Sequence, residues 1–135
     1  MQSLAAISIL VPSYDAGLRF FRDALGFEIV EDTDQGDGKR WIVVAPRGGR
    51  GARIVVAVPG DERQRARIGD QTGGRVGYFL FTDDFESDYA SMRARGVRFL
   101  EEPRREPYGR VAVFADPWGG KWDLLQPLDG AQSGA

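Results

Sequence analysis

The sequence predicts an α+β fold made of two βαβββ modules related by internal duplication. The order strand, helix and three strands occurs twice, on either side of a polar connector. An offset of 70 residues aligns Gly26 with Gly96, the glycines expected to end the two helices. An offset of 71 residues aligns the turn sequence APRGG with DPWGG. These matches agree with the element order, which favours duplication over chance.

The first module is predicted over residues 4–58. Its apolar opening run, residues 4–11, ends before Pro12 and is typical of a buried strand. Asp15 can cap the helix that follows, and Gly26 ends it. The apolar stripe of this helix comprises Leu18, Phe21, Ala24 and Leu25. Three strands follow at residues 27–31, 40–46 and 52–58, and residues 32–39 form a turn-rich loop between the first two.

The second module is predicted over residues 75–127, after a polar connector at 59–74 with a short helix at 62–68. A strand at 75–82 leads into a helix at 85–95, capped by Asp84. Strands are expected at 97–101, 110–115 and 121–126, and residues 128–135 form a frayed tail. With 135 residues, the chain has room for one domain, spanning residues 1–135.

Charge and composition exclude several classes of partner. The net charge is −2 and the arginines are scattered among acids, which argues against nucleic acid. The chain lacks an apolar run of about 18 residues, so no membrane span is expected. The N-terminus lacks the basic region of a signal peptide, so we expect a cytoplasmic protein.

The sequence contains neither cysteine nor histidine. Disulfides, thiolate metal sites and cysteine nucleophiles are therefore excluded, as are a histidine base and a Ser-His-acid triad. Metal ligands would have to come from carboxylates, amides, hydroxyls or carbonyls, whereas most transition-metal sites use imidazole or thiolate.

Asp123 is the acid that stands out, because it lies in an otherwise apolar closing strand. Alternation puts it on the opposite face from Trp122 and Leu124. If those two side chains pack under a helix, Asp123 faces a cleft. It would there pair with a basic side chain, anchor a cationic or hydrogen-bonding ligand, or act as a base, and the sequence leaves these alternatives open.

Five further residues are candidate ligand contacts. Phe79 and Gly77 share a strand face, and Gly77 leaves room for a ligand ring. Trp41 adds aromatic surface, and Tyr108 and Arg110 would fix a ligand carboxylate or hydroxyl. The structural alternatives are core packing for the aromatics and loop packing or an ion pair for Tyr108 and Arg110. Aromatic surface with one acid suits a flat, partly cationic molecule.

Three segments together resemble the vicinal oxygen chelate superfamily, which includes glyoxalase I, bleomycin-resistance proteins, fosfomycin-resistance enzymes and extradiol dioxygenases. They are LRFFRDALGFEIVED, DDFESDYASMRARGVRFLEEP and YGRVAVFADPWGGKWDLLQP. The resemblance covers about residues 4–127. It implies two modules that form curved mixed sheets around a cleft, usually completed in a homodimer.

The resemblance also implies four metal-ligand positions, of which this sequence keeps one. They fall on Ala6, Gly77, either Val55 or Val56, and Asp123. Only Asp123 offers a donor, so the chain resembles a member that lacks the metal-ligand histidines. We therefore expect no metal and no cofactor.

The sequence thus predicts a metal-free protein that binds a small aromatic or cationic organic molecule in its cleft, of the sequestration or resistance type. Its expected partners are a second copy of itself and that ligand, without nucleic acid or membrane. No catalytic residue is assigned, and whether the protein catalyses any reaction stays open. One alternative is a metal-dependent lyase, isomerase or dioxygenase-like enzyme with a hard ion at Asp123. Another is a structural dimerisation module.

Overall fold

The computed structural model describes residues 1–128 and divides into two compact units, Met1–Ile68 and a second that begins at Gly69. Each unit is described by itself. The boundary falls within the predicted connector. Of the predicted tail, residues 129–135 lie outside the described residues.

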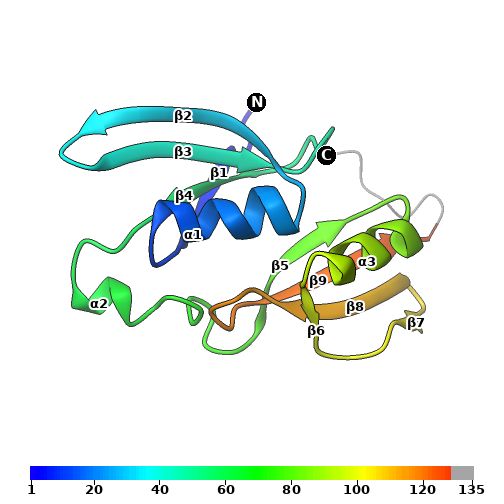
Figure 1. Ribbon diagram of the computed structural model, residues 1–135. Coiled ribbons are helices and arrows are strands. Elements are labelled where there is room, and N and C mark those ends of the chain that lie inside the picture. The colour runs from blue at the N-terminus through cyan, green and yellow to red at the C-terminus, as the bar shows by residue number, and fades with distance from the viewer. Residues whose placement is uncertain (129–135) are drawn as a thin grey trace. The chain divides into compact units, whose positions relative to one another are not determined.

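The first unit is a four-stranded mixed sheet with one face covered by helix (Figure 1). Its strand order is β1 (Ala6–Leu10), β4 (Arg53–Ala57), β3 (Lys39–Ala45) and β2 (Glu28–Gly36). β1 and β4 are parallel, and the other neighbours are antiparallel. The buried side chains of the sheet include Ile9, Ile42, Val44, Ile54 and Val56.

The helix of this unit has two parts, α1 (Tyr14–Leu18) and the π-helical η1 (Arg19–Ala24). The prediction that Asp15 caps it is wrong, because the Ser13 hydroxyl accepts the hydrogen bond from the backbone of Ala16. Gly26 ends the helix as predicted, with φ 77°. Gly17 allows close packing on the sheet, since a Cβ there would lie 2.8 Å from Val56.

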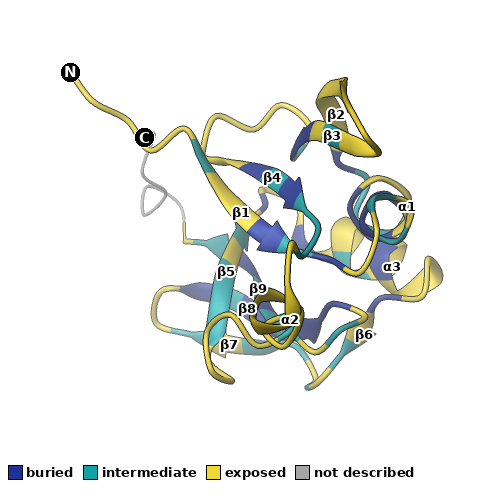
Figure 2. Cartoon of the chain, turned by 90° about the vertical axis from the view of Figure 1, so that its left-hand side faces the viewer, coloured by how far each residue is buried: buried dark blue, intermediate teal, exposed yellow. Residues whose placement is uncertain are grey.

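The predicted loop at 32–39 is mostly strand. β2 continues to Gly36, and the turn is confined to Asp37 and Gly38, both with positive φ. All nine residues of β2 are exposed (Figure 2), and residues 32–36 are polar, so no apolar alternation marks this part as strand. Pairing with β3 stabilises this polar part of β2 as a strand, and the Asp32 carboxylate binds Arg40 of β3 at 2.7 Å.

A short helix, α2 (Glu62–Arg65), lies in the connector and is shorter than predicted. Its N-cap is Asp61, whose side chain accepts a hydrogen bond from the backbone of Gln64. No helix among residues 1–128 is long and apolar enough to cross a membrane.

The second unit has the same sheet topology. Its strand order is β5 (Val76–Phe81), β9 (Lys121–Pro127), β8 (Gly109–Ala115) and β6 (Arg98–Phe99), and β5 and β9 are parallel. α3 (Phe85–Ala94) lies along one face (Figure 1), capped by Asp84 as predicted. The repeated strand order agrees with the predicted duplication and the α+β class.

The predicted strand at 97–101 is shorter than expected, and an additional strand, β7 (Arg104–Glu106), pairs with β8. Between β6 and β7 the chain leaves the sheet. The Glu101 carboxylate fills the gap by accepting a hydrogen bond from the backbone of Val113 at 3.0 Å. This side chain takes the place of a missing strand carbonyl, which a pattern of apolar residues does not reveal.

Candidate functional site

The register of the second sheet places Asp123 between two apolar neighbours. Asp123 lies opposite Phe79 on the parallel strand β5 and opposite Val113 on the antiparallel strand β8. Both backbone polar groups of Val113 bond away from β9, to Glu101 and to Leu100. Val113 and Asp123 are therefore a non-hydrogen-bonded pair, the kind whose side chains approach most closely.

Two residues further along β9, Leu125 lies opposite Phe81 of β5 and Val111 of β8 in the same way. Because paired residues share a face, these three lie beside Phe79, Val113 and Asp123. We call this set of six side chains the Asp123 face. Val111 and Leu125 are buried, whereas Phe79 and Phe81 are 61% and 46% exposed. The Asp123 face therefore combines an apolar floor with two accessible aromatic rings and one carboxylate.

The opposite face of the sheet packs against α3 through a chain of aromatic contacts. The rings of Tyr89, Phe99, Phe114 and Trp122 follow one another with centroids 4.5–5.6 Å apart. Trp122 and Leu124 are buried there. Trp122 and Leu124 thus pack under the helix, as the sequence analysis required. Because side chains alternate along a strand, Asp123 points to the other side of the sheet.

The carboxyl group of Asp123 is partly desolvated. Its Oδ1 is buried and has no hydrogen-bond partner among residues 1–128. Burial raises the pKa of Asp123; the nearby Arg104 charge opposes this, and the Glu101 charge adds to it. A buried acceptor left unpaired in this way is costly, so a hydrogen-bond donor that reached this oxygen would stabilise it.

A polar cluster beside Asp123 was not predicted. Arg104 of β7 lies opposite Val111, which puts it on the same side of the sheet as Asp123. Its Nε donates to Glu101 at 3.0 Å, and its Nη1 donates to Glu106. The side chains of Tyr108, Glu101 and Glu106 raise the pKa of Arg104 above its usual range. We call Glu101, Arg104, Glu106 and Tyr108 the Arg104 cluster.

Tyr108 lies in this cluster, in the turn between β7 and β8, and is 48% exposed. Arg110 lies elsewhere. It is opposite Gln126 on the helix-covered face, where it binds Glu86 at 2.8 Å and sits over the ring of Phe85. The ion pair that the sequence offered as the alternative is therefore present, and Arg110 does not lie on the Asp123 face.

Gly77 does not leave the free space that the sequence suggested. A Cβ at Gly77 would lie 2.4 Å from Cγ2 of Thr72, whose side chain fills that position. The Thr72 hydroxyl is held there by donating to the backbone of Arg75 at 2.7 Å. The absence of a side chain at Gly77 thus lets the connector pack closely against β5.

Trp41 belongs to the first unit. It lies on β3 opposite Thr33 and is 40% exposed. Alternation puts it on the same face as Val43, opposite the buried Ile42. It is exposed within its own unit, whereas Asp123 belongs to the second unit.

The first unit shows which residue corresponds to Asp123. Val55 lies opposite Ser8 on the parallel strand and opposite Val43 on the antiparallel strand. This repeats the arrangement of Asp123 with Phe79 and Val113, so Val55, rather than Val56, is the counterpart. In the first unit the matching position therefore carries an apolar side chain.

These residues do not fit a metal centre. The family positions Ala6, Val55 and Gly77 have no donor side chains, and Asp123 supplies one carboxylate. Among residues 1–128 there is no group of three or more Asp and Glu side chains placed to hold an ion. A single carboxylate does not make the coordination shell that such ions require.

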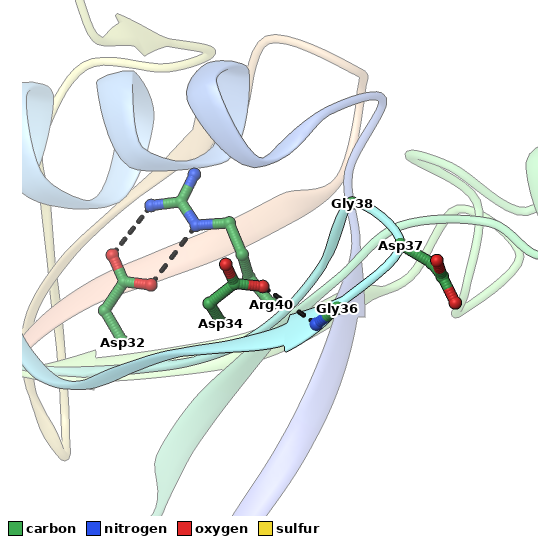
Figure 3. A pocket seen from close by; sticks show the side chains of 6 residues that line it. All are labelled: Asp32, Asp34, Gly36, Asp37, Gly38 and Arg40. Carbon is green, nitrogen blue, oxygen red and sulfur yellow. Dashed lines mark hydrogen bonds and ion pairs between the residues drawn. The ribbon is translucent and has the colours of Figure 1, made fainter.

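A hollow of about 410 Å³ lies at the tip of the β2–β3 hairpin (Figure 3). Its lining is polar: Asp32, Asp34, Gly36, Asp37, Gly38 and Arg40. Both oxygens of Asp32 accept hydrogen bonds from Arg40, and Asp34 accepts one from the backbone of Gly36. None of the predicted site residues lines this hollow. It lacks the apolar walls typical of a site for an organic molecule.

Comparison with known proteins places this geometry in context. The family model for the Glyoxalase/Bleomycin resistance protein/Dioxygenase superfamily matches residues 3–124. An uncharacterized protein of Shewanella frigidimarina (strain NCIMB 400) is 44% identical over 95% of this chain and 96% of its own.

Two solved structures are also similar. The structure of UcmS2 has a TM-score of 0.78 and 30% identity, covering 93% of this chain and 98% of its own. That of TnmS3, described as an antibiotic binding protein from Streptomyces sp. CB03234, has a TM-score of 0.74 and 29% identity. It covers 94% of this chain and 97% of its own.

Proposed function

Because the chain belongs to the Glyoxalase/Bleomycin resistance protein/Dioxygenase superfamily, we propose that it binds a small aromatic or cationic organic molecule on its Asp123 face. In this proposal the protein sequesters the molecule, as a resistance protein would, and does so without a metal ion. The observation that carries the proposal is the pairing of Asp123, with its unpartnered buried oxygen, and the exposed ring of Phe79.

The two side chains are complementary in what they offer. The Phe79 ring supplies a surface for stacking or for a cation–π contact. Asp123 supplies an acceptor whose unmet hydrogen-bonding capacity a ligand donor would satisfy. Few but well-placed polar groups in an apolar setting are typical of sites for organic molecules.

The similarity to TnmS3 supports binding without requiring catalysis. That protein is described as antibiotic binding, and the similarity extends over nearly the whole of both chains. The donor set supports the absence of a metal, because Asp123 is alone among the family's ligand positions in carrying a donor side chain. We further propose a homodimer, and the cytoplasmic location stays a prediction.

A thermal-shift screen of planar organic molecules tests the proposal. A tight binder raises the melting temperature by mass action, and the shift should be lost in Phe79→Ser. Serine is the residue at the matching position of the first unit, Ser8. The control is Ile29→Ser, which changes an exposed apolar residue of β2 and should keep the ligand shift. A screen without any stabilising compound, or equal loss in both variants, would contradict the proposal.

Native mass spectrometry of the purified protein tests the absence of a metal. We expect the mass of the polypeptide, with or without an organic molecule. A stoichiometric divalent ion that is lost in Asp123→Asn would instead support the metal-dependent alternative.

A further inference from the structure

We propose that the Arg104 cluster makes the Asp123 face selective for planar aromatic amines and excludes carboxylates of the same shape. This rests on the proposed function, since it names the chemical class of ligand for that site. The geometry that carries it is the enclosure of Arg104 by Glu101 and Glu106 beside Asp123.

Arg104 would otherwise be the natural anchor for a ligand carboxylate. A free guanidinium binds carboxylates through two parallel hydrogen bonds. Here its Nε is taken by Glu101 and its Nη1 by Glu106, and the Tyr108 side chain helps to raise the pKa of Arg104. An anionic ligand would have to displace a carboxylate already in place, so Arg104 gives it little net attraction.

Glu101 is held firmly in this role. Its Oε2 accepts both from Arg104 and from the backbone of Val113, the residue opposite Asp123. The negative charge is therefore fixed near Asp123 and does not move with a flexible side chain. The Asp123 pKa records the influence of both Arg104 and Glu101.

From Asp123 to the Leu125 end of the Asp123 face, the charges sum to a negative value. Asp123, Glu101 and Glu106 are three acids, and Arg104 is one base. Lys121 and Arg98 also share this face, because both lie opposite Ala115, but that is the end of the face away from Leu125 and Phe81. A cation placed against Asp123 gains from this field, and an anion is repelled by it.

The apolar part of the face fits fused rings. Phe79 and Phe81 are two residues apart on one strand, which separates them by roughly 6.6 Å at the usual rise per residue. Buried Val111 and Leu125 lie next to them. A planar system of two or three fused rings would span both phenyl rings, with its substituent directed at Asp123.

The test uses three anthracene derivatives that differ only in the substituent on the central ring, which is an aminomethyl, a hydroxymethyl or a carboxylate group. Affinity is measured by the fluorescence anisotropy of the anthracene. We expect the amine to bind about tenfold more tightly than the alcohol, and the carboxylate to bind more weakly still. Asp123→Asn should reduce the preference for the amine over the alcohol to about twofold or less.

A second set of variants tests the Arg104 cluster itself. In the double variant Glu101→Gln with Glu106→Gln, hydrogen bonds to Arg104 can persist while the two negative charges are removed. The carboxylate should then gain at least about tenfold in affinity and the amine should lose affinity. The control Glu102→Gln changes the charge of an exposed neighbour and should leave the order unchanged. So should Lys121→Gln.

The outcomes separate the two proposals. Equal binding of all three probes, lost in Phe79→Ser, would overturn the charge selectivity and leave the proposed function standing. Tightest binding of the carboxylate would overturn the selectivity as well, and its loss in Lys121→Gln would assign the anchor to that lysine. Absence of binding by all three, in a folded protein, would overturn the selectivity for aromatic amines, and a negative thermal-shift screen would then remove the proposed function too.

Discussion

The indole Nε1 of Trp122 donates a hydrogen bond to the buried carboxylate of Asp116 at 3.2 Å. The same carboxylate accepts from the backbone amides of Trp118 and Gly120. One side chain thus ties the DPWGG turn to the aromatic layer under α3.

Replacing Asp116 should therefore be strongly destabilising. Asp116→Ala removes three hydrogen bonds and should lower the free energy of unfolding by about 3 kcal/mol, taking roughly 1 kcal/mol for each. Asp116→Asn keeps an acceptor for the amides but turns a donor toward the indole, so it should also destabilise. Urea unfolding measures both. As a control, Asp34→Ala removes one exposed bond to Gly36 and should cost under about 1 kcal/mol.

Asp123→Asn should stabilise the protein at neutral pH. The folded-state pKa of Asp123 is raised, chiefly by burial, so its ionised form is disfavoured on folding. The stability of the unmodified protein is therefore greatest below the ordinary pKa of an aspartate and falls as the pH rises through the folded-state pKa. The variant escapes this fall.

We expect the gain at pH 7 to be under about 1 kcal/mol, because the group is partly exposed to solvent. It should vanish below about pH 3.5. Chemical denaturation at several pH values measures the difference, with Glu102→Gln as a control. A variant less stable than the parent at pH 7 would show that Asp123 is satisfied within the fold. Stabilisation together with loss of ligand binding is the pattern of a functional site.

Two glycines with positive φ should differ sharply in their tolerance of alanine. At Gly38 (φ 79°) a Cβ meets nothing within 4 Å, so Gly38→Ala should cost only the backbone strain, about 1–2 kcal/mol. At Gly69 (φ 73°) a Cβ would lie 1.8 Å from the carbonyl oxygen of Trp118. Gly69→Ala must move backbone and should cost clearly more. Thermal unfolding of the pair checks this, and equal melting temperatures would be inconsistent with it.

The two faces of the second sheet should respond differently to loss of a phenyl ring. Phe114 is fully buried in the aromatic layer, so Phe114→Ala should cost about 3–5 kcal/mol. Phe79 is mostly exposed, so Phe79→Ala should change the free energy of unfolding by only about 0.5 kcal/mol or less. Denaturant titration distinguishes the two. A large loss for Phe79→Ala would mean that its ring is covered in the assembled protein.

Local chemistry explains what could be predicted. Gly26 and Gly96 end helices because glycine adopts positive φ without strain, a property that needs no distant partner. Alternation alone put Asp123 on the opposite face from Trp122, and the register confirms it. The second half of β2, residues 32–36, escaped prediction because it is polar, and its pairing with β3 depends on partners elsewhere in the chain.

The composition of the site was harder to predict for the same reason. Arg110 and Arg104 are both arginines near the closing hairpin, but only their partners on neighbouring strands show that Arg110 is on the face covered by α3 and Arg104 on the face of Asp123. Glu101 looked like an ordinary strand end. Its role follows from a hydrogen bond to Val113, twelve residues away.

The sequence by itself determined the duplicated α+β fold, the glycines that end two of the helices and the lack of imidazole and thiolate ligands, because these depend on residue type and on spacing within one element. Only the tertiary structure decided that Thr72 fills the space over Gly77, that Arg110 lies apart from Asp123, and that Arg104 is enclosed by two glutamates. Those facts depend on strand register and loop path, which arise from contacts between residues distant in the chain.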